Sequence, residues 1–163
     1  MSETTLQERL IRTCRENGDH QALADSSGAR VTFGEALAKA LFLTGRLQSI
    51  WANQSKVGIL VPPSVGGTLV NWAALLMGKI PVNLNYTLSQ EGIVSCLEQC
   101  GITDVVVSGK LMKRLKLELP VRVHVIEDLV TEPRLMERLR AGFLAKCTSV
   151  KGLLKRLGGS QAK

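Results

Sequence analysis

Residues 57–86 read VGILVPPSVGGTLVNWAALLMGKIPVNLNY, and their pattern of apolar runs and breakers predicts the fold class of this chain. The first five of these residues are continuously apolar and end at two prolines, and residues 80–84 form a second short run after a glycine. Short apolar runs bounded by breakers predict strands, and a continuously apolar run predicts a strand buried on both faces of a parallel sheet. Residues 64–77 between them are almost wholly apolar over helical length, which predicts a buried helix. The stretch therefore predicts two parallel strands joined by a helix.

Further short runs of the same kind occur on both sides of this stretch. Residues 104–108 and 121–126 are rich in valine and are bounded by glycine or proline. Residues 22–25 and 30–33 flank a Ser-Ser-Gly turn, which predicts a β-hairpin. Strands that alternate with helices predict an α/β fold, in which a mostly parallel sheet carries helices on both faces.

Helix starts are marked by capping boxes, in which a threonine precedes Glu or Gln by three residues. The two side chains of such a pair satisfy two backbone donors at the start of a helix. The three pairs are Thr5 with Glu8, Thr32 with Glu35, and Thr87 with Gln90. Apolar residues recur at helical spacing behind each pair, so three helices are expected there, the third over about residues 89–99.

The composition is that of one ordinary globular domain with an aliphatic core. Of the 163 residues 45% are hydrophobic, 21% are charged and 4% are aromatic, which excludes a disordered chain. No apolar run approaches the roughly 18 residues that span a bilayer, and the N-terminus lacks a signal-peptide pattern, so the expected location is cytoplasmic. Cys14, Cys96, Cys100 and Cys147 lack zinc-site spacing, so we expect reduced thiols and no metal site.

The net charge of +7 lies entirely in the last third of the chain. Residues 1–112 carry equal numbers of acidic and basic side chains, whereas residues 113–163 carry twelve Lys/Arg against five Asp/Glu. We therefore divide the chain into an α/β N-terminal subdomain, residues 1–128, and a basic amphipathic helical tail, residues 129–163. The tail is helical in pattern over residues 132–157, with a weak middle that predicts two helices.

Two interpretations of this basic tail remain open. Its apolar face suits a helical linker that packs on a further subdomain, and this is the preferred interpretation. Basic residues beside an apolar face also suit a peripheral contact with the inner face of a membrane through residues 134–157. Nucleic acid is not expected as a partner, because charge is its only support and aromatic side chains that stack on bases are few.

Asn83, Asn85 and Tyr86 emerge where the second strand of the opening stretch ends. Ligands of open α/β sheets bind at the carboxyl ends of the strands, so these three are the candidate substrate-binding residues. Such side chains serve loop backbone equally well, and the residues alone do not decide between the two roles. Residues 62–67 open a helix at the same edge, where a helix N-terminus favours anions, although their glycines suit close packing better.

The sequence nominates no catalytic residue, no cofactor-binding residue and no metal ligand. It contains no Walker-type phosphate loop, dinucleotide fingerprint, zinc-protease motif or nucleophile elbow. His20 lies in a polar context and is interpreted as solvated. His124 falls inside a predicted strand and is interpreted as structural, because the spacing offers it no nucleophile or carboxylate partner.

Three phrases, taken in order, resemble those of a known family. They are residues 21–26 (QALADS) with 31–37 (VTFGEAL), residues 57–64 (VGILVPPS) with 75–86 (LLMGKIPVNLNY), and residues 100–108 (CGITDVVVS). Their order and spacing resemble the N-terminal part of the acyl-adenylate-forming, or AMP-binding, superfamily. The variants Pro-Pro-Ser and Pro-Val-Asn-Leu-Asn-Tyr look most like the acyl-acyl carrier protein synthetase domain of bacterial 2-acylglycerophosphoethanolamine acyltransferases and the long-chain fatty acyl-CoA ligases.

The resemblance implies that a full-length relative activates a fatty acid with ATP and Mg²⁺ to acyl-AMP, then passes the acyl group to the thiol of acyl carrier protein or coenzyme A. The family's Ser/Thr/Gly-rich phosphate loop with its lysine is missing here, and in relatives it follows a segment like the basic tail. We therefore expect an N-terminal fragment of an AMP-forming acid–thiol ligase, inactive alone and without a cofactor of its own. The alternative is a non-catalytic lipid- or membrane-surface binding module that uses the basic tail.

Overall fold

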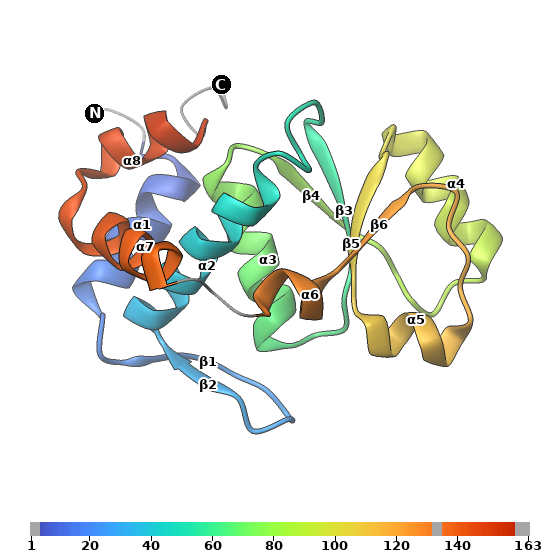
Figure 1. Cartoon of the computed structure of the whole chain (residues 1–163), viewed down its shortest axis with the longest axis horizontal. Helices are drawn as coiled ribbons and strands as arrows, with labels where there is room; N and C mark the ends of the chain where they lie inside the picture. The colour runs from blue at the N-terminus through green and yellow to red at the C-terminus, as the bar shows by residue number, and fades with distance from the viewer. Residues whose placement is uncertain (1–3, 132–134, 159–163) are drawn as a thin grey trace.

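The computed structural model describes residues 4–131 and 135–158 of the chain (Figure 1). In this part a parallel sheet is flanked by helices, and a helical layer with a small hairpin lies to one side of it. The elements in chain order are α1 (Leu6–Glu16), β1 (Gln21–Ala24), β2 (Arg30–Thr32), α2 (Phe33–Leu47), β3 (Lys56–Leu60), α3 (Val65–Leu76), β4 (Ile80–Asn83), α4 (Gln90–Cys100), β5 (Asp104–Val107), α5 (Gly109–Leu115), β6 (Arg122–Val125), α6 (Ile126–Val130), α7 (Leu135–Cys147) and α8 (Val150–Leu157). The predicted α/β fold is confirmed.

The sheet has the strand order β4-β3-β5-β6, and each neighbouring pair is parallel. Val57 of β3 lies opposite Pro81 of β4, and Ile59 of β3 lies opposite Val106 of β5. Proline is tolerated in β4 because, within the described residues, β4 is an edge strand. The central strands β3 and β5 are buried nearly throughout, which explains why their sequences are continuously apolar.

Side chains alternate along the central strands and build one core on each face of the sheet. Ile59 and Val106 face the side of α3 and α6, whereas Leu60 and Val105 face the side of α4 and α5 (Figure 1). Gly58 allows the second core to close, because a Cβ at this position would lie only 3.0 Å from the Val105 side chain.

A layer formed by α1, α2, α7 and α8 extends the larger core, and α2 packs against α1, α3 and α7. Arg15 of α1 donates to the carbonyl oxygens of Ala145 (2.7 Å) and Thr148 (2.7 Å) at the end of α7. Arg46 of α2 makes two hydrogen bonds, 2.8 and 2.7 Å long, to the Glu137 carboxylate of α7. The described part of the basic tail is therefore fixed to the N-terminal helices, while the division of the chain at residue 128 stays a prediction.

Two of the predicted capping boxes begin helices as expected. The Thr5 hydroxyl accepts a hydrogen bond from the Glu8 N–H at the start of α1. Thr32 and Glu35 form the full reciprocal box at the start of α2. Both starts were recognisable because all the atoms involved lie within four consecutive residues.

The third predicted capping box is wrong. Thr87 does not cap α4; its hydroxyl and its N–H both donate to the Asn85 side-chain oxygen. Ser89 is the N-cap, two residues further on, and Gln90 accepts from the Glu118 N–H instead of reaching back to the helix start. Because Thr87 is bonded to Asn85 in an Asx turn, it is not the cap of the helix, and the helix starts after the hydroxyl of Ser89.

The helical part of the tail forms two helices, α7 and α8, as its weak middle predicts. Ser149 caps α8 by accepting from the Gly152 N–H at 3.1 Å. Residues 132–134, where the predicted helix was to begin, lie outside the described residues. Among the helices that are described, none has both the length and the apolar character that a membrane crossing requires.

Candidate functional site

A hollow of about 340 Å³ lies where β3 and β4 end and α3 begins. Residues 61–64 form one wall, the first turns of α3 form a second, and residues 83–86 form the third. Asn83, Asn85 and Tyr86 all line it, so the structure brings the three sequence-predicted residues together. The position also agrees with the rule that ligands of open α/β sheets bind beyond the carboxyl ends of the strands. Their role in substrate binding stays a prediction.

Asn83 is held by a residue that sequence reasoning missed. Asn71 of α3 donates to the Asn83 side-chain oxygen at 3.0 Å, and Asn83 donates back to the Asn71 side-chain oxygen at 2.8 Å. Asn71 also donates to the carbonyl of Gly67, one turn earlier in α3. The signal was present in the sequence, because an asparagine in an otherwise apolar helix needs polar partners. This reciprocal pair fixes which amide atoms face the hollow.

The other two predicted residues differ in how free they are to meet a ligand. The Asn85 side-chain oxygen accepts from both the N–H and the hydroxyl of Thr87, at 2.9 and 2.8 Å. Asn85 therefore shapes the loop, which is the second of the two roles considered from sequence. Tyr86 is half-buried against the core between the sheet and α4, while its ring also lines the hollow. Asn83 and Tyr86 are thus the better placed of the three to contact a ligand.

The start of α3, considered from sequence as an anion site, is occupied by the chain's own oxygens. The Ser64 hydroxyl accepts from the Gly67 N–H at 3.1 Å, and the Asp25 carboxylate accepts from the Val65 N–H at 2.9 Å. Hydrogen bonds from the Ser27 hydroxyl and from that N–H hold the pKa of the Asp25 carboxyl below its ordinary value. The β1–β2 hairpin, predicted from its Ser-Ser-Gly turn, therefore also delivers a cap to a helix forty residues away.

A second carboxylate closes the next helix start along the same edge of the sheet. Glu127 accepts from the Gly109 N–H at 3.0 Å and from the Ser108 hydroxyl at 3.3 Å. Burial raises the pKa of the Glu127 carboxyl, but the hydrogen bonds outweigh burial and leave that pKa below its ordinary value. The N-termini of α3 and α5 therefore both carry a negative charge from elsewhere in the chain.

At the opposite edge of the sheet Asp104 gathers a cluster of polar side chains. Its side chain is 2% exposed, and its carboxylate accepts from Arg122 at 2.7 and 2.6 Å and from Gln54 at 2.9 Å. His124 Nε2 lies 2.8 Å from the same carboxylate. The Arg122 guanidinium is the main cause that holds the pKa of Asp104 far below its ordinary value, against the effect of burial. His124 therefore has a carboxylate partner that the sequence spacing did not reveal, and its interpretation as structural stays a prediction.

No group of three or more His, Cys, Asp or Glu side chains suited to a metal ion occurs among the described residues. Cys14 is buried, Cys96 and Cys100 are half-buried, and Cys147 is exposed; all four are free thiols. Burial raises the pKa of the Cys14 thiol to about 11, so this residue is a packed side chain and not a nucleophile.

Comparisons with known proteins place this fold. A family model described as AMP-binding enzyme matches residues 10–151. Among solved structures, the chain is similar to the nonribosomal peptide synthetase FmoA3 bound to alpha-methyl-L-serine-AMP, with a TM-score of 0.69 and 21% identity over 80% of this chain and 15% of that one. It is similar to a benzoate CoA ligase from Burkholderia xenovorans LB400, with a TM-score of 0.66 and 20% identity over 78% of this chain and 28% of the ligase.

It is also similar to O-succinylbenzoate coenzyme A synthetase (MenE) from Bacillus subtilis in complex with ATP and magnesium ion, with a TM-score of 0.66 and 21% identity over 76% of this chain and 34% of that one. The chain spans between 15% and 34% of the length of these three proteins. At such identities the likeness shows the fold, and the family match covers most of the chain. This chain belongs to the AMP-binding enzyme family.

Proposed function

We propose that this chain forms the N-terminal part of an AMP-forming ligase that activates a fatty acid. In this class of reaction a carboxylate oxygen attacks the α-phosphorus of ATP and releases pyrophosphate, and a thiol then attacks the acyl carbonyl and releases AMP. The observation that carries the proposal is the family match over residues 10–151, together with a hollow at the carboxyl ends of β3 and β4. The proposed thiol belongs to coenzyme A or acyl carrier protein.

The described residues do not by themselves fit ATP and Mg²⁺. The N–H groups that open α3 and α5 are bonded to Asp25 and Glu127, whose negative charges oppose a phosphate at either helix start. No cluster of metal-binding side chains occurs within residues 4–131 and 135–158. We therefore propose that the phosphates and the metal are held by another part of the enzyme.

The proposed contribution of this chain is one wall of the substrate site. Asn83 presents an amide whose orientation is fixed by Asn71, and Tyr86 lines the same hollow. A fixed amide donates and accepts hydrogen bonds without the entropy cost of ordering a free side chain. Preference for a fatty acid over an aryl or amino acid is supported by the Pro-Pro-Ser and Pro-Val-Asn-Leu-Asn-Tyr phrases that resemble fatty acid ligases.

Pyrophosphate release tests both levels of this proposal. The 163-residue chain alone, given ATP, Mg²⁺ and a long-chain fatty acid, is expected to release none. The gene expressed together with its downstream coding sequence is expected to release pyrophosphate faster with a long-chain fatty acid than with benzoate or an amino acid. Robust turnover by the 163-residue chain alone would refute the partial-enzyme proposal, and a preference for benzoate or an amino acid would refute the fatty acid.

A second candidate function, attachment to a lipid surface, rests on a different observation. The described part of the basic tail places exposed Lys and Arg side chains on α7 and α8, and it lies on the outside of the helical layer (Figure 1). A cytoplasmic enzyme peripheral to the inner face of the membrane is consistent with both candidate functions, since long-chain acyl groups partition into bilayers.

A further inference from the structure

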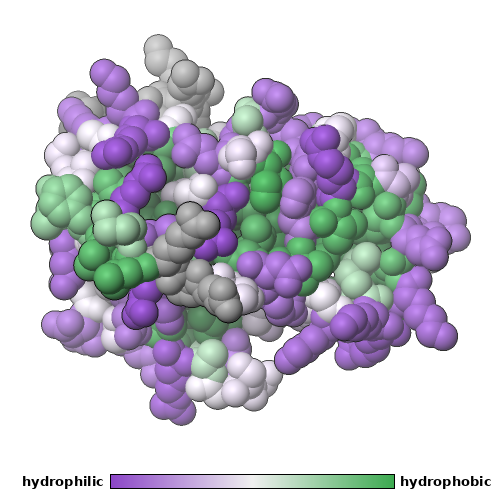
Figure 2. All heavy atoms as spheres, viewed as in Figure 1, coloured by the Kyte–Doolittle hydropathy of each residue, from purple (hydrophilic) through white to green (hydrophobic). Residues whose placement is uncertain are grey.

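The outer surface of α7 is apolar where a surface helix is ordinarily polar. Four large apolar side chains of this helix are mostly exposed: Leu135 (70%), Met136 (74%), Leu139 (58%) and Phe143 (62%). Successive residues of an α-helix are turned by about 100°, so these four positions fall within an arc of about 100°. Figure 2 shows hydrophobic surface at the left, where Figure 1 places α7, and further hydrophobic areas in the middle and on the right of the same view. We call these four side chains the outward face of α7.

The outward face lies opposite the face by which α7 is attached. Ala141, Leu144 and Ala145 are buried against the helical layer, about half a turn away from the outward face. The Arg46–Glu137 pair and the Arg15 hydrogen bonds to the end of α7 hold the helix in this rotation. Because these contacts hold α7 in place, its outward face stays exposed in the described part of the chain, and an exposed apolar patch of this kind often marks an interaction surface.

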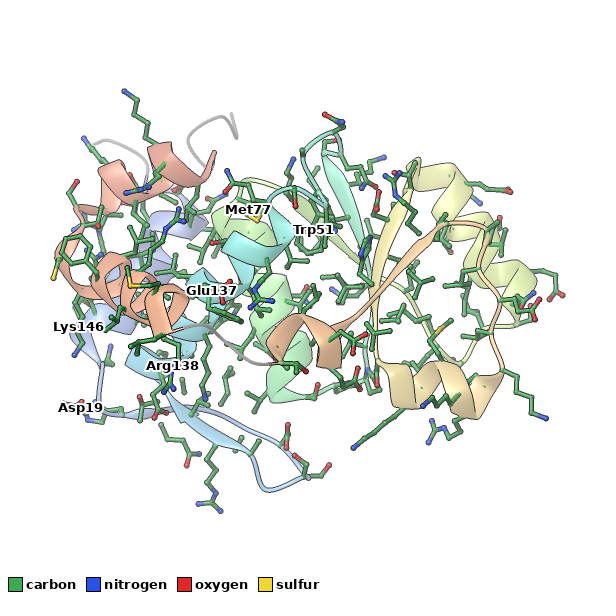
Figure 3. All side chains as sticks on the ribbon, viewed as in Figure 1. Asp19, Trp51, Met77, Glu137, Arg138 and Lys146 are labelled. Atoms are coloured by element: carbon green, nitrogen blue, oxygen red, sulfur yellow. The ribbon has the colours of Figure 1, made fainter. Side chains whose placement is uncertain are left out.

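The charged residues around the outward face indicate which kind of partner could bind it. Arg138 and Arg140 flank it on its two sides, Lys146 lies near its C-terminal end, and all three are exposed. Glu137, the acidic residue of α7, lies beside α2 (Figure 3) and accepts two hydrogen bonds from Arg46 of that helix. Residues 138–157 contain six Lys/Arg and no Asp or Glu. Among the described residues of α7, the charged side chains that flank the outward face are therefore basic.

We propose that the outward face of α7 inserts into the headgroup region of an anionic lipid bilayer and does not pack on a further subdomain, which was the interpretation preferred from sequence, because the flanking side chains Arg138, Arg140 and Lys146 are basic. Leu, Met and Phe side chains enter the acyl boundary, while flanking Arg and Lys side chains reach up to lipid phosphates; this is the arrangement of an interfacial amphipathic helix. Long-range attraction between these basic residues and an anionic surface strengthens the binding. The inference deepens the second candidate function, attachment to a lipid surface, and does not depend on the carboxylate-activating function.

A second copy of the chain fits this face poorly. Two copies that met through α7 would bring Arg138, Arg140 and Lys146 of both chains together, and like charges across an interface are unfavourable. An anionic bilayer offers an acyl-chain region for the apolar side chains of α7 and negatively charged headgroups for its Arg and Lys side chains.

Vesicle co-sedimentation with the full 163-residue chain tests the inference. We expect binding to phosphatidylcholine vesicles that contain about 30 mol% phosphatidylglycerol and little binding to phosphatidylcholine alone. Raising the ionic strength from about 0.1 to about 0.5 M is expected to weaken the binding several-fold, because screening shortens the reach of the basic residues. Phe143→Ser, which leaves the charge unchanged, is expected to lower partitioning about tenfold, and Phe143→Glu to lower it further.

Ile80→Glu is the matched control, because Ile80 is also an exposed apolar residue (55%) but lies on edge strand β4, away from α7. It adds the same single negative charge as Phe143→Glu. Because the added charge lies away from α7, Ile80→Glu is expected to bind anionic vesicles with an affinity within about twofold of that of the parent chain. Circular dichroism confirms that each variant is folded, and Phe143→Ser serves if Phe143→Glu is not. Absence of binding to anionic vesicles at low salt, or equal binding by Phe143→Ser and the parent chain, would overturn the inference. So would dimers of the parent chain that Phe143→Ser converts to monomers.

Discussion

The two edges of the parallel sheet both carry polar side chains, and they use them in opposite ways. Where the strands begin, the buried Asp104 carboxylate bonds to Arg122 and Gln54 and lies beside His124. Where the strands end, Asn83 lines an open hollow. It accepts one hydrogen bond from Asn71 and donates one back, which leaves its second N–H for another partner. A buried charged residue whose hydrogen bonds are all made with protein groups stabilises the fold. A polar group that is held in place beside open space can still bond to a ligand. The number of polar residues at an edge therefore does not locate a binding site.

The largest expected effect on stability is at Asp104, at the edge where the strands begin. Asp104→Ala is expected to lower the free energy of unfolding by about 3 kcal/mol, because it removes a buried carboxylate and leaves its hydrogen-bond donors without their acceptor. Urea unfolding followed by circular dichroism measures the change. Arg122→Ala is the comparison, and it is expected to cost less because Gln54, Thr103 and His124 still contact the Asp104 carboxylate after the Arg122 side chain is removed. An Asp104→Ala variant as stable as the parent chain would contradict a structural role for this cluster.

The pH dependence of stability sharpens the same point. The pKa of Asp104 is held below its ordinary value, chiefly by Arg122, so its stabilising contribution is complete above the unfolded pKa of about 3.9. That contribution is lost as the pH falls from there toward the folded pKa, because protonation then removes the charge that Arg122 bonds. Asp104→Asn, which cannot titrate, should therefore be less stable than the parent chain near pH 6, with a gap that narrows below about pH 4. Urea unfolding at a series of pH values measures the gap, and a constant gap would point to lost packing instead.

The sequence was informative where structure depends on neighbours along the chain. The buried strands β3 and β5 were recognisable from their continuous apolar runs, and the caps at Thr5 and Thr32 from four-residue motifs. The Thr87 box failed because Asn85 offered the threonine a competing local bond. Local signals are thus reliable until two of them compete for the same atoms.

Partners that are distant in the sequence could not be predicted. Asp104 was counted as the first residue of an apolar strand, and its partner Gln54 is fifty residues away. Asp25 caps a helix forty residues ahead of it, which a turn motif does not reveal. The three candidate residues at the end of β4 were placed at the hollow by a general rule for α/β sheets, whereas Asn71 required the structure because α3 alone does not say which strand end it faces.

A smaller effect is expected at the helix start that Glu127 closes. Glu127→Ala is expected to lower the free energy of unfolding by about 1 kcal/mol, because the Gly109 N–H loses the acceptor that caps α5. Glu98→Ala, at an exposed position of α4, is the control and should change stability by less than about 0.5 kcal/mol. Thermal and urea unfolding measure both variants. If Glu127→Ala leaves the free energy of unfolding unchanged, the Glu127 carboxylate does not stabilise the start of α5. The argument that its charge keeps phosphate away from this helix start would then lose its support.

The smallest effect on stability is expected at Asn83, the residue on which the open edge depends. Asn83→Ala should change the free energy of unfolding by no more than about 0.5 kcal/mol, because the Asn71 amide that it releases can bond to water in the hollow. In the proposed enzyme that contains this chain, the same variant should lower kcat/KM for the carboxylate several-fold, a change that loss of folding cannot produce at this stability. Asn85→Ala, which removes an Asx turn beside the same hollow, is the comparison, and its effect should fall on loop stability first. If Asn83→Ala instead destabilises the chain as much as Asp104→Ala, then the Asn71–Asn83 pair also stabilises the fold, and the substrate must be sought elsewhere on the sheet.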